Sequence, residues 1–267
     1  MQITSLHRYP IKGCRGHVVE QATLDILGIA DDRRLMLVDA RGRFVSQREL
    51  PQLATITPEL DGPMLSVRAG AMHATHELDW RGPLRSVTIW GDVVEATDQG
   101  DAMAEWFSEA AGAPLRLVAF GHAARRPIDP DFTPRDDAET AFTDGYPLLV
   151  VVQESLDALN AALEVPVPMS RFRPSVVVQG APAWSEDRWR TLAVGPLVMD
   201  AVKPCARCVV TTTDQATGVR DPDQEPLRTL ARLHTIQGFG AIFGMNVVPR
   251  SPGTLAVGDV MTLVAHA

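Results

Sequence analysis

The chain has 267 residues, of which 45% are apolar and 22% are charged, and its formal net charge is −8. This length and apolar content exclude an isolated small module and a disordered chain, because enough apolar surface is present for a substantial core. The acidic balance argues against nucleic acid and anionic membranes as the principal partners, although it leaves room for a local basic pocket.

The cysteines and the N-terminus indicate the compartment. Three cysteines are an odd number and too few for a disulfide framework, so we expect free or metal-bound thiols in a reducing compartment. The N-terminus lacks the apolar core of a signal peptide, and no run approaches the roughly 20 apolar residues of a membrane helix. We therefore expect a cytoplasmic protein that does not bind membranes.

The first part of the chain consists of short apolar runs separated by Gly and Pro. This pattern is typical of strands joined by turns. In chain order, strands are predicted over residues 3–9, 18–26, 35–38, 44–45, 65–67, 87–90 and 93–96, with turns at 39–42 and 91–92.

Helices join the pattern in the middle and at the end of the chain. One helix is predicted to begin with Asp98 or Asp101 as its cap and to end at Gly112, because its apolar residues recur at helical spacing. Two more are predicted over residues 154–163 and 226–233. Further strands are predicted over residues 115–120, 148–152, 176–179, 197–202, 209–213, 242–248 and 260–264. The pattern predicts a β-rich α+β protein with a boundary near residues 112–120, before a polar, proline-containing loop.

Residues 203–208, Lys-Pro-Cys-Ala-Arg-Cys, carry the sharpest local motif. Two cysteines at this spacing can bind zinc, but a structural zinc site takes four ligands and Cys14 is the one remaining cysteine. A thioredoxin-like pair would open a helix, whereas residues 209–213 predict a strand. Two inert buried thiols, or one metal-ligating or nucleophilic thiolate, are the other readings. Arg207 and Lys203 close by favour the thiolate form.

Three further segments place polar side chains at the ends of apolar runs. Arg171 and Arg173 would point to one side of an extended strand and clamp an anion, although such a pair can equally be ordinary surface arginines. Lys12 precedes glycines at which a ligand can approach the backbone, or it is a solvated turn residue. Thr143 and Asp144 can bind a ligand, but bracing the Asp-Gly turn explains them more simply.

Taken in order, these motifs resemble the MOSC proteins that carry an N-terminal β-barrel-like domain, such as the amidoxime-reducing components and their bacterial relatives. The matching stretches lie at residues 9–12, 32–34, 47–48, 143–147, 171–174, 203–208 and 252–259. The resemblance spans nearly the whole chain. It implies an N-terminal β-barrel-like domain over residues 1–118, packed on a C-terminal MOSC β-barrel with peripheral helices over residues 119–267.

The resemblance also implies a molybdenum cofactor of the molybdopterin type, and no pyridoxal phosphate. Carried over residue by residue, Cys208 is the metal ligand and a catalytic residue, and Asp144 is a second catalytic residue. The residues implied in cofactor binding are Lys12, Arg34, Thr143, Gly145, Arg173, Ser175 and Arg207. Because both halves of the chain supply ligands, we expect the cofactor in the cleft between them.

Two positions depart from the family pattern. Ser175 stands where the family usually has Asn, and Gly13 stands where it often has Ser. Both changes remove or shorten a polar contact, since a hydroxyl cannot replace all the donors and acceptors of an amide.

The activity that the resemblance implies is the reduction of N-hydroxylated compounds: amidoximes, hydroxylamines and N-hydroxylated bases. The electrons would come from a separate protein, a flavin reductase or a ferredoxin-like or cytochrome-type protein, because the chain has no cysteine set of its own for a ferredoxin-like domain. One alternative is a sulfur-carrier or cofactor-handling protein that bears a persulfide on Cys208. Another is a pterin-binding scaffold without catalysis.

Overall fold

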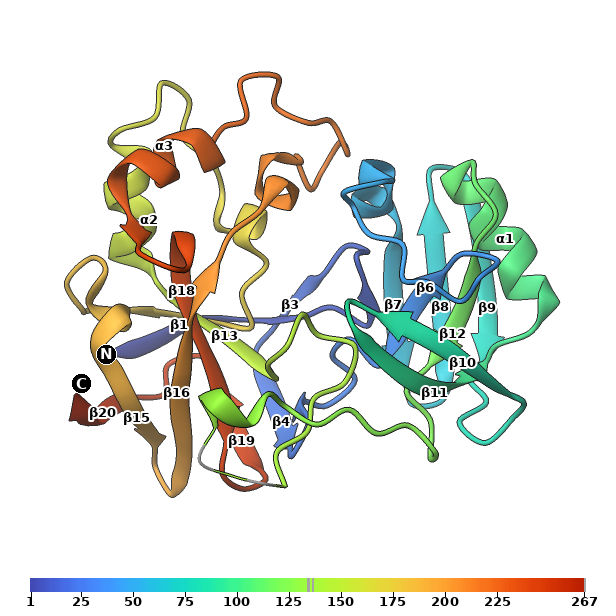
Figure 1. Cartoon of the computed structure of the whole chain (residues 1–267), viewed down its shortest axis with the longest axis horizontal. Helices are drawn as coiled ribbons and strands as arrows, with labels where there is room; N and C mark the ends of the chain where they lie inside the picture. The colour runs from blue at the N-terminus through green and yellow to red at the C-terminus, as the bar shows by residue number, and fades with distance from the viewer. Residues whose placement is uncertain (134, 136, 267) are drawn as a thin grey trace.

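The computed structural model describes residues 1–133, 135 and 137–266, and it shows two lobes side by side (Figure 1). The C-terminal lobe contains a nine-stranded sheet with the helices α2 (Gln153–Asn160) and α3 (Leu227–Leu233). The N-terminal lobe contains a five-stranded sheet, a three-stranded sheet and the helix α1 (Asp101–Ala111). The predicted β-rich α+β class is confirmed.

The nine-stranded sheet is mainly antiparallel, with one parallel pair, β13 with β14. Its strands in spatial order are β20 (Met261–His266), β15 (Trp189–Val194), β16 (Leu197–Ala206), β18 (Gly240–Pro249), β13 (Leu148–Val152), β14 (Val176–Gln179), β1 (Gln2–Arg8) and β3 (His17–Val19), and β17 (Thr235–Ile236) pairs with β18. All five residues of β13 are buried, which explains why this strand is a continuous apolar run rather than an alternating one.

The N-terminal lobe combines two smaller sheets. The five-stranded sheet has the order β10 (Leu84–Ile89), β11 (Asp92–Asp98), β12 (Arg116–Ala119), β6 (Leu35–Val38) and β2 (Ile11–Lys12), and the three-stranded sheet has β7 (Thr57–Asp61), β8 (Met64–Ala69) and β9 (Met72–Glu77). Helix α1 buries Met103 and Phe107 in the core of this lobe and ends where Gly112 adopts a left-handed φ of 65°.

The first strands of the chain belong to the C-terminal lobe. In β1, Leu6 lies opposite Val176 of β14, and β3 extends the same sheet. A second three-stranded sheet pairs β4 (Gln21–Asp25) with β5 (Gly28–Ile29) and with β19 (Gly253–Ala256) near the end of the chain. The chain therefore crosses between lobes within its first 40 residues, twice around β2 and again before β6. Within the described chain, no sheet closes on itself.

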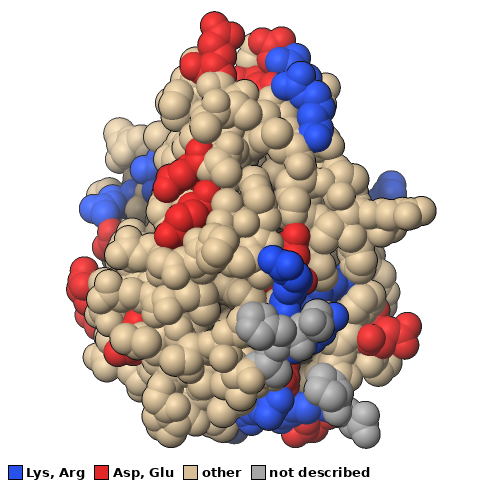
Figure 2. All heavy atoms as spheres, turned by 90° about the vertical axis from the view of Figure 1, so that its left-hand side faces the viewer, with Lys and Arg blue, Asp and Glu red and all other residues tan. Residues whose placement is uncertain are grey.

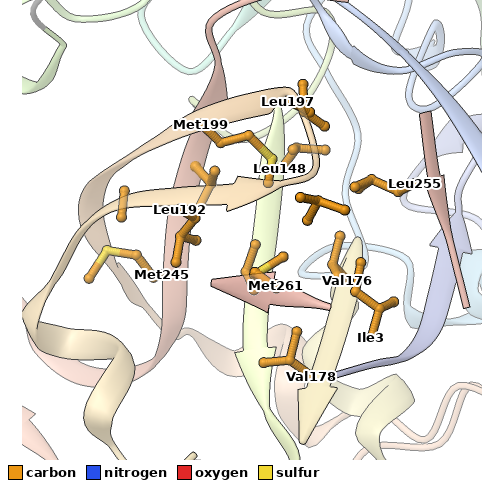
Figure 3. Packing of buried hydrophobic residues seen from close by; sticks show 14 of the residues in the cluster. Ile3, Leu148, Val176, Val178, Leu192, Leu197, Met199, Met245, Leu255 and Met261 are labelled. Carbon is orange, nitrogen blue, oxygen red and sulfur yellow. The ribbon is translucent and has the colours of Figure 1, made fainter. Parts of the chain in front are cut away.

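The core of the C-terminal lobe lies against the nine-stranded sheet (Figure 3). Side chains from both ends of the chain meet there, each at most 1% exposed: Ile3, Leu148, Val176, Leu255 and Met261. Strand β1 therefore contributes apolar burial to a nine-stranded sheet whose other strands, apart from β3, begin at Leu148 or later.

The described chain contains five short 3₁₀ helices: η1 (Pro51–Thr55), η2 (Pro130–Phe132), η3 (Met169–Phe172), η4 (Ser185–Arg188) and η5 (Val209–Thr212). Two of them, η3 and η5, replace segments that were predicted to be extended. The strand predicted over residues 209–213 is wrong, because the hydroxyls of Thr211 and Thr212 donate to the carbonyls of Cys208 and Val209 and hold a helical turn. The extended segment predicted around Arg171 is wrong as well, since η3 occupies it.

Smaller differences concern the ends of elements. The run predicted as one strand over residues 18–26 forms parts of β3 and β4, and residues 44–45 contribute one isolated bridge from Phe44 to Val38. Neither predicted aspartate caps α1, because Gly100 is the N-cap and Asp98 instead accepts hydrogen bonds from Arg85 and Arg116.

On the side of the molecule that Figure 2 presents, Lys, Arg, Asp and Glu form small separate groups within a largely uncharged area. Among the helices of the described residues, none has the length and apolar character to cross a membrane.

Candidate functional site

A cavity of about 330 Å³ lies between the two lobes, and both lobes line it. The N-terminal half of the chain supplies Lys12, Arg33 and Trp90, and the C-terminal half supplies Arg173 and Cys208. A ligand in this cavity would therefore be held by both lobes at once.

The cavity gathers most of the residues that the sequence singled out. Eight of the nine line it: Lys12, Thr143, Asp144, Gly145, Arg173, Ser175, Arg207 and Cys208. They come from four separate stretches of sequence, which strands β2, β13, β14 and β16 bring to one place.

Arg34 is the predicted residue that lies elsewhere. Its Nη2 donates to both carboxylate oxygens of Asp25 at 2.7 Å, in the turn between β4 and β5. Its neighbour Arg33 lines the cavity instead, with a left-handed φ of 49°. Of the two arginines in this motif, Arg33 and not Arg34 is therefore placed to bind a cofactor in the cavity.

The two thiols of the cavity have different surroundings. Cys208 is half-buried, ends the extended stretch after β16 and serves as the N-cap of η5. Cys205 accepts a hydrogen bond from Nη1 of Arg207 at 2.9 Å, and Nη2 of the same guanidinium donates to the carbonyl of Phe172 at 2.8 Å. Arg207 therefore fixes Cys205 directly, and the Cys208 sulfur is left to the cavity.

Lys12 and Asp144 form an ion pair across the lobes, with 2.5 Å between Nζ and Oδ1. Burial lowers the pKa of Lys12 to about 8, against the opposing effect of the Asp144 charge. Although its position in the cavity opposes ionisation, the Lys12 ammonium holds the pKa of Asp144 below its usual range. At neutral pH the proton of the pair therefore resides on Lys12, and Asp144 is an acceptor.

Arg33 and Arg173 enclose the buried ring of Tyr9, with their Cζ atoms 4.3 and 4.4 Å from its centroid. Arg33 is ion-paired with Asp32. Arg173 donates to the Gln215 amide oxygen at 3.1 Å and has no carboxylate partner among the described residues. The stack holds two guanidinium groups beside the cavity, one of them with unbalanced charge.

A buried amide pair fixes the acceptor of Arg173. Gln47 of the N-terminal lobe and Gln215 of the C-terminal lobe exchange hydrogen bonds of 3.1 and 2.9 Å. The Gln47 amide also donates to the carbonyl of Gly13 at 2.7 Å. This pair ties the two lobes together directly behind Arg173.

Two further predicted residues act through hydroxyl groups. Thr143 Oγ1 lies 2.6 Å from Thr140 Oγ1, and the carbonyl of Thr143 accepts from Arg126. The fully buried Ser175 hydroxyl accepts from the backbone N–H of Leu149 at 3.2 Å, and its own hydrogen remains available to the cavity. Near them, a Cβ built on Gly145 would meet nothing within 4 Å, so the glycine leaves room beside the backbone.

Several lining residues were missed in the sequence. Arg33 and Arg48 both line the cavity. Each lies in a stretch that matches the family, residues 32–34 and 47–48, but the sequence does not show which residue of the stretch faces the cavity. The sequence pattern predicts Trp90 only as the last residue of a strand over residues 87–90. Lys203 is expected beside the thiols, but its Nζ lies 3.7 Å from the centroid of the Phe132 ring.

The donors fit an anionic group that carries a soft metal. Nε of Arg207 is buried without a hydrogen-bond partner among the described residues, and Arg173 has no balancing carboxylate. In the part of the chain that the structure describes, no three His, Cys, Asp or Glu side chains gather around one point. A metal at Cys208 would thus take one soft thiolate from the protein and its other ligands from elsewhere.

Known proteins resemble this chain along almost its entire length. Two family models match, the MOSC N-terminal beta barrel domain over residues 1–114 and the MOSC domain over residues 137–262. The chain is 32% identical over 288 residues to mitochondrial amidoxime-reducing component 1 of Homo sapiens, covering 99% of this chain and 83% of that protein. It is 30% identical to mitochondrial amidoxime reducing component 2 of Bos taurus, covering 96% and 81%.

A solved structure aligns with part of the chain. The crystal structure of YiiM from Geobacillus stearothermophilus covers 45% of this chain and 55% of its own, with a TM-score of 0.33 and 13% identity.

Proposed function

The chain belongs to the MOSC family, and from that premise and the geometry of the cavity we propose that it is a molybdenum-cofactor-dependent oxidoreductase. Its substrates would be N-hydroxylated compounds: amidoximes, hydroxylamines and N-hydroxylated bases. The relatives named as amidoxime-reducing components support this substrate class.

One observation carries the proposal. The cavity combines the Cys208 thiol with Arg173, a guanidinium that has no carboxylate partner among the described residues. A thiolate is the ligand that a soft metal prefers, and an unbalanced guanidinium suits a phosphate. Cys208 would hold the metal, and Lys12, Arg33 and Arg173 would bind the anionic part of the cofactor, with Thr143, Gly145, Ser175 and Arg207 around it.

The reaction breaks an N–O bond with two electrons and two protons and releases water. The two-electron chemistry is what a bound molybdenum cofactor supplies. The protein's residues orient the substrate and supply protons. Lys12, with a pKa of about 8, carries a proton at Nζ near neutral pH, and the lowered pKa of Asp144 keeps that carboxylate ionised, so Asp144 would hold the Lys12 ammonium in place beside the substrate.

A separate protein would deliver the electrons. The three cysteines of this chain are fewer than the four thiolates that an iron–sulfur cluster usually takes. The relatives carry the word component in their names, in keeping with a reaction shared among proteins. The type of donor, whether flavin reductase, ferredoxin-like or cytochrome-type, is left to experiment. All three thiols are unpaired, in keeping with a reducing compartment, and we propose the cytoplasm.

The test is elemental analysis of protein made in a host that synthesises molybdenum cofactor. We expect near-stoichiometric molybdenum in the wild type, loss of molybdenum in Cys208→Ala, and retention in the matched control Cys205→Ala. Thermal unfolding of all three proteins shows whether each is folded. Reduction of an amidoxime, with a reduced viologen dye as the electron source, should follow the metal content.

Two outcomes would contradict the proposal. Equal molybdenum in wild type and Cys208→Ala would remove the thiolate from the metal site. A wild-type protein without molybdenum or pterin, with a persulfide on Cys208 in its intact mass, would instead support the sulfur-carrier function.

A further inference from the structure

Trp90 occupies a strained position at the rim of the cavity. It lies in the two-residue turn of the β10–β11 hairpin, between the paired residues Ile89 and Asp92, and its φ is 56°. The left-handed region is unfavourable for a bulky side chain. The next residue, Gly91, is not among the glycines with positive φ, and a Cβ there would meet nothing within 4 Å. In this turn the left-handed φ therefore falls on the tryptophan, although the adjacent glycine could adopt it without strain.

The strain belongs to a pattern around the cavity. Six described residues other than glycine have a left-handed φ, and three of them line this cavity: Arg33, Trp90 and Arg173. Strained backbone persists where the surrounding structure holds it, and it concentrates at functional sites. Arg33 and Arg173 are two of the cationic residues that line the cavity, and Trp90 shares their left-handed backbone.

The indole ring is held by its neighbours and is not buried in the core. Its side chain is 46% exposed, and it is the one aromatic residue among the large exposed hydrophobic residues described. The Arg48 guanidinium lies 4.4 Å from the ring, and Phe44 meets the ring edge-on at 5.5 Å between centroids. These two contacts hold the ring in place where Trp90 lines the cavity.

The position of Trp90 distinguishes it from the residues deeper in the cavity. The Lys12 side chain is 7% exposed, and Phe44 is 6% exposed. Trp90 therefore adds an exposed aromatic surface to the cavity, next to the buried Lys12 ammonium, which lies 5.8 Å from the centroid of its ring. Aromatic rings prefer offset or edge-to-face contacts with other planar groups.

We propose that Trp90 is a specificity-determining residue that stacks on the planar part of the substrate and favours aryl over alkyl N-hydroxylated compounds. The inference rests on the proposed function. It assigns the strain in the β10–β11 turn to substrate selection, because the left-handed φ belongs to the turn residue that lines the cavity.

The test compares an aryl with an alkyl amidoxime, benzamidoxime with acetamidoxime, on molybdenum-loaded protein with a reduced viologen dye as the electron source. Trp90→Asn removes the ring but tolerates the left-handed φ. Trp90→Phe retains a ring. Val93→Asn is a matched control, because Val93 lies in the same hairpin, is 68% exposed and is not a cavity residue.

In Trp90→Asn we expect the aryl-to-alkyl ratio of KM to rise about three- to tenfold, the range that loss of one aromatic contact gives. Trp90→Phe should keep most of the preference, and the ratio in Val93→Asn should match the wild type.

Three results would overturn the inference. They are an unchanged KM ratio in Trp90→Asn, an equal change for both substrates, and a loss of molybdenum from Trp90→Asn, which would place the residue in the cofactor site. Calorimetric titration of benzamidoxime without reductant separates this inference from the proposed function. If the wild type turns over no N-hydroxylated compound, the proposed function fails. Weaker binding to Trp90→Asn would even then support stacking, and equal binding would refute it.

Discussion

Arg33 and Arg34 are neighbours in the sequence, but their guanidinium groups lie in different surroundings. Arg33 stacks on Tyr9 beside the cavity, whereas Arg34 braces the β4–β5 turn through Asp25. We expect Arg33→Gln to lower the molybdenum content several-fold, because a cation that would bind the cofactor is lost. Arg34→Gln should lower the melting temperature and leave the molybdenum content per folded protein unchanged. The reverse result, measured by elemental analysis and thermal unfolding, would restore Arg34 to the site.

The same pair shows what the sequence can predict about the site. Its motifs identified eight residues that the structure brings to one cavity, because residue type and order carry the resemblance. Choosing between two adjacent arginines requires the backbone angle. The left-handed φ of Arg33 decides which guanidinium faces the cavity, and neither hydrophobic periodicity nor composition records that angle.

Glu186 gives a prediction for the pH dependence of stability. Burial raises the pKa of this carboxyl group to about 7, and Ser155 donates to it at 2.8 Å. Between roughly pH 4.5 and 7 the unfolded chain ionises before the folded one, so the free energy of unfolding should fall as pH rises. Urea unfolding should show a decrease of about 2–3 kcal/mol from this group, absent in Glu186→Gln.

His234 must be separated from this effect. Although burial opposes it, hydrogen bonds to Asp187 and to the carbonyl of Ile242 raise the pKa of His234. Its stabilising contribution is present below the pKa of an unfolded histidine and is lost as pH rises through the folded value, so the sign is the same. His234→Gln is therefore the control, because it removes the contribution of the histidine and leaves the pH slope that Glu186 causes. A pH slope in Glu186→Gln equal to that of the wild type would show that the carboxyl group does not cause it.

At the scale of elements, Gly244 determines how β18 passes β13. Its φ is +83°, and a Cβ there would lie 2.5 Å from Val151 Cγ1 and 2.9 Å from the carbonyl oxygen of Val150. We expect Gly244→Ala to lower the free energy of unfolding by roughly 2–4 kcal/mol, from steric overlap together with backbone strain. Gly195→Ala, at a φ of +53° with no atom within 4 Å, should cost about 1 kcal/mol. If denaturant unfolding gave both variants the same decrease in the free energy of unfolding, the close approach of β18 and β13 would not be what requires a glycine at residue 244.

The elements themselves were predicted to different degrees. Strands such as β6, β13 and β14 match the predicted bounds, because an apolar run between turn residues is a local signal. The segment after Cys208 was predicted as a strand because its residues are β-branched. Hydroxyl groups that return to nearby carbonyls override that propensity, and these bonds depend on a conformation that the sequence does not reveal.

At the scale of the whole molecule, the strands shared between the ends of the chain should couple the lobes. Strands β1 and β3 lie in the nine-stranded sheet, β4 pairs with β19, and the Gln47–Gln215 pair joins the lobes at the cavity. We therefore expect one cooperative transition in calorimetry of the full chain, coincident with the transition followed by circular dichroism. Two separated transitions would show that the lobes unfold independently.

This arrangement limits what sequence can predict about domains. The division at residues 118 and 119 stays a prediction, because a boundary along the chain does not describe strands that pair across it. Residue patterns identify a strand but not a partner 170 positions away, as between Leu6 and Val176. A fragment of residues 119–267 would lack β1 and β3, so its failure to bind cofactor would not distinguish a missing ligand from a missing strand.

The pairing of β1 with β14 also has a consequence for synthesis on the ribosome. Leu6 leaves the exit tunnel first, but its partner Val176 is made 170 residues later. At about 5–20 residues per second, β1 waits for roughly 10–30 seconds with its apolar face uncovered. During this delay the sheet of β6, β10, β11 and β12 can already assemble, since its strands end by Ala119. Chaperones that shield nascent chains therefore have a defined target in this protein, its first strand, and the cavity between the lobes is completed only when translation is nearly finished.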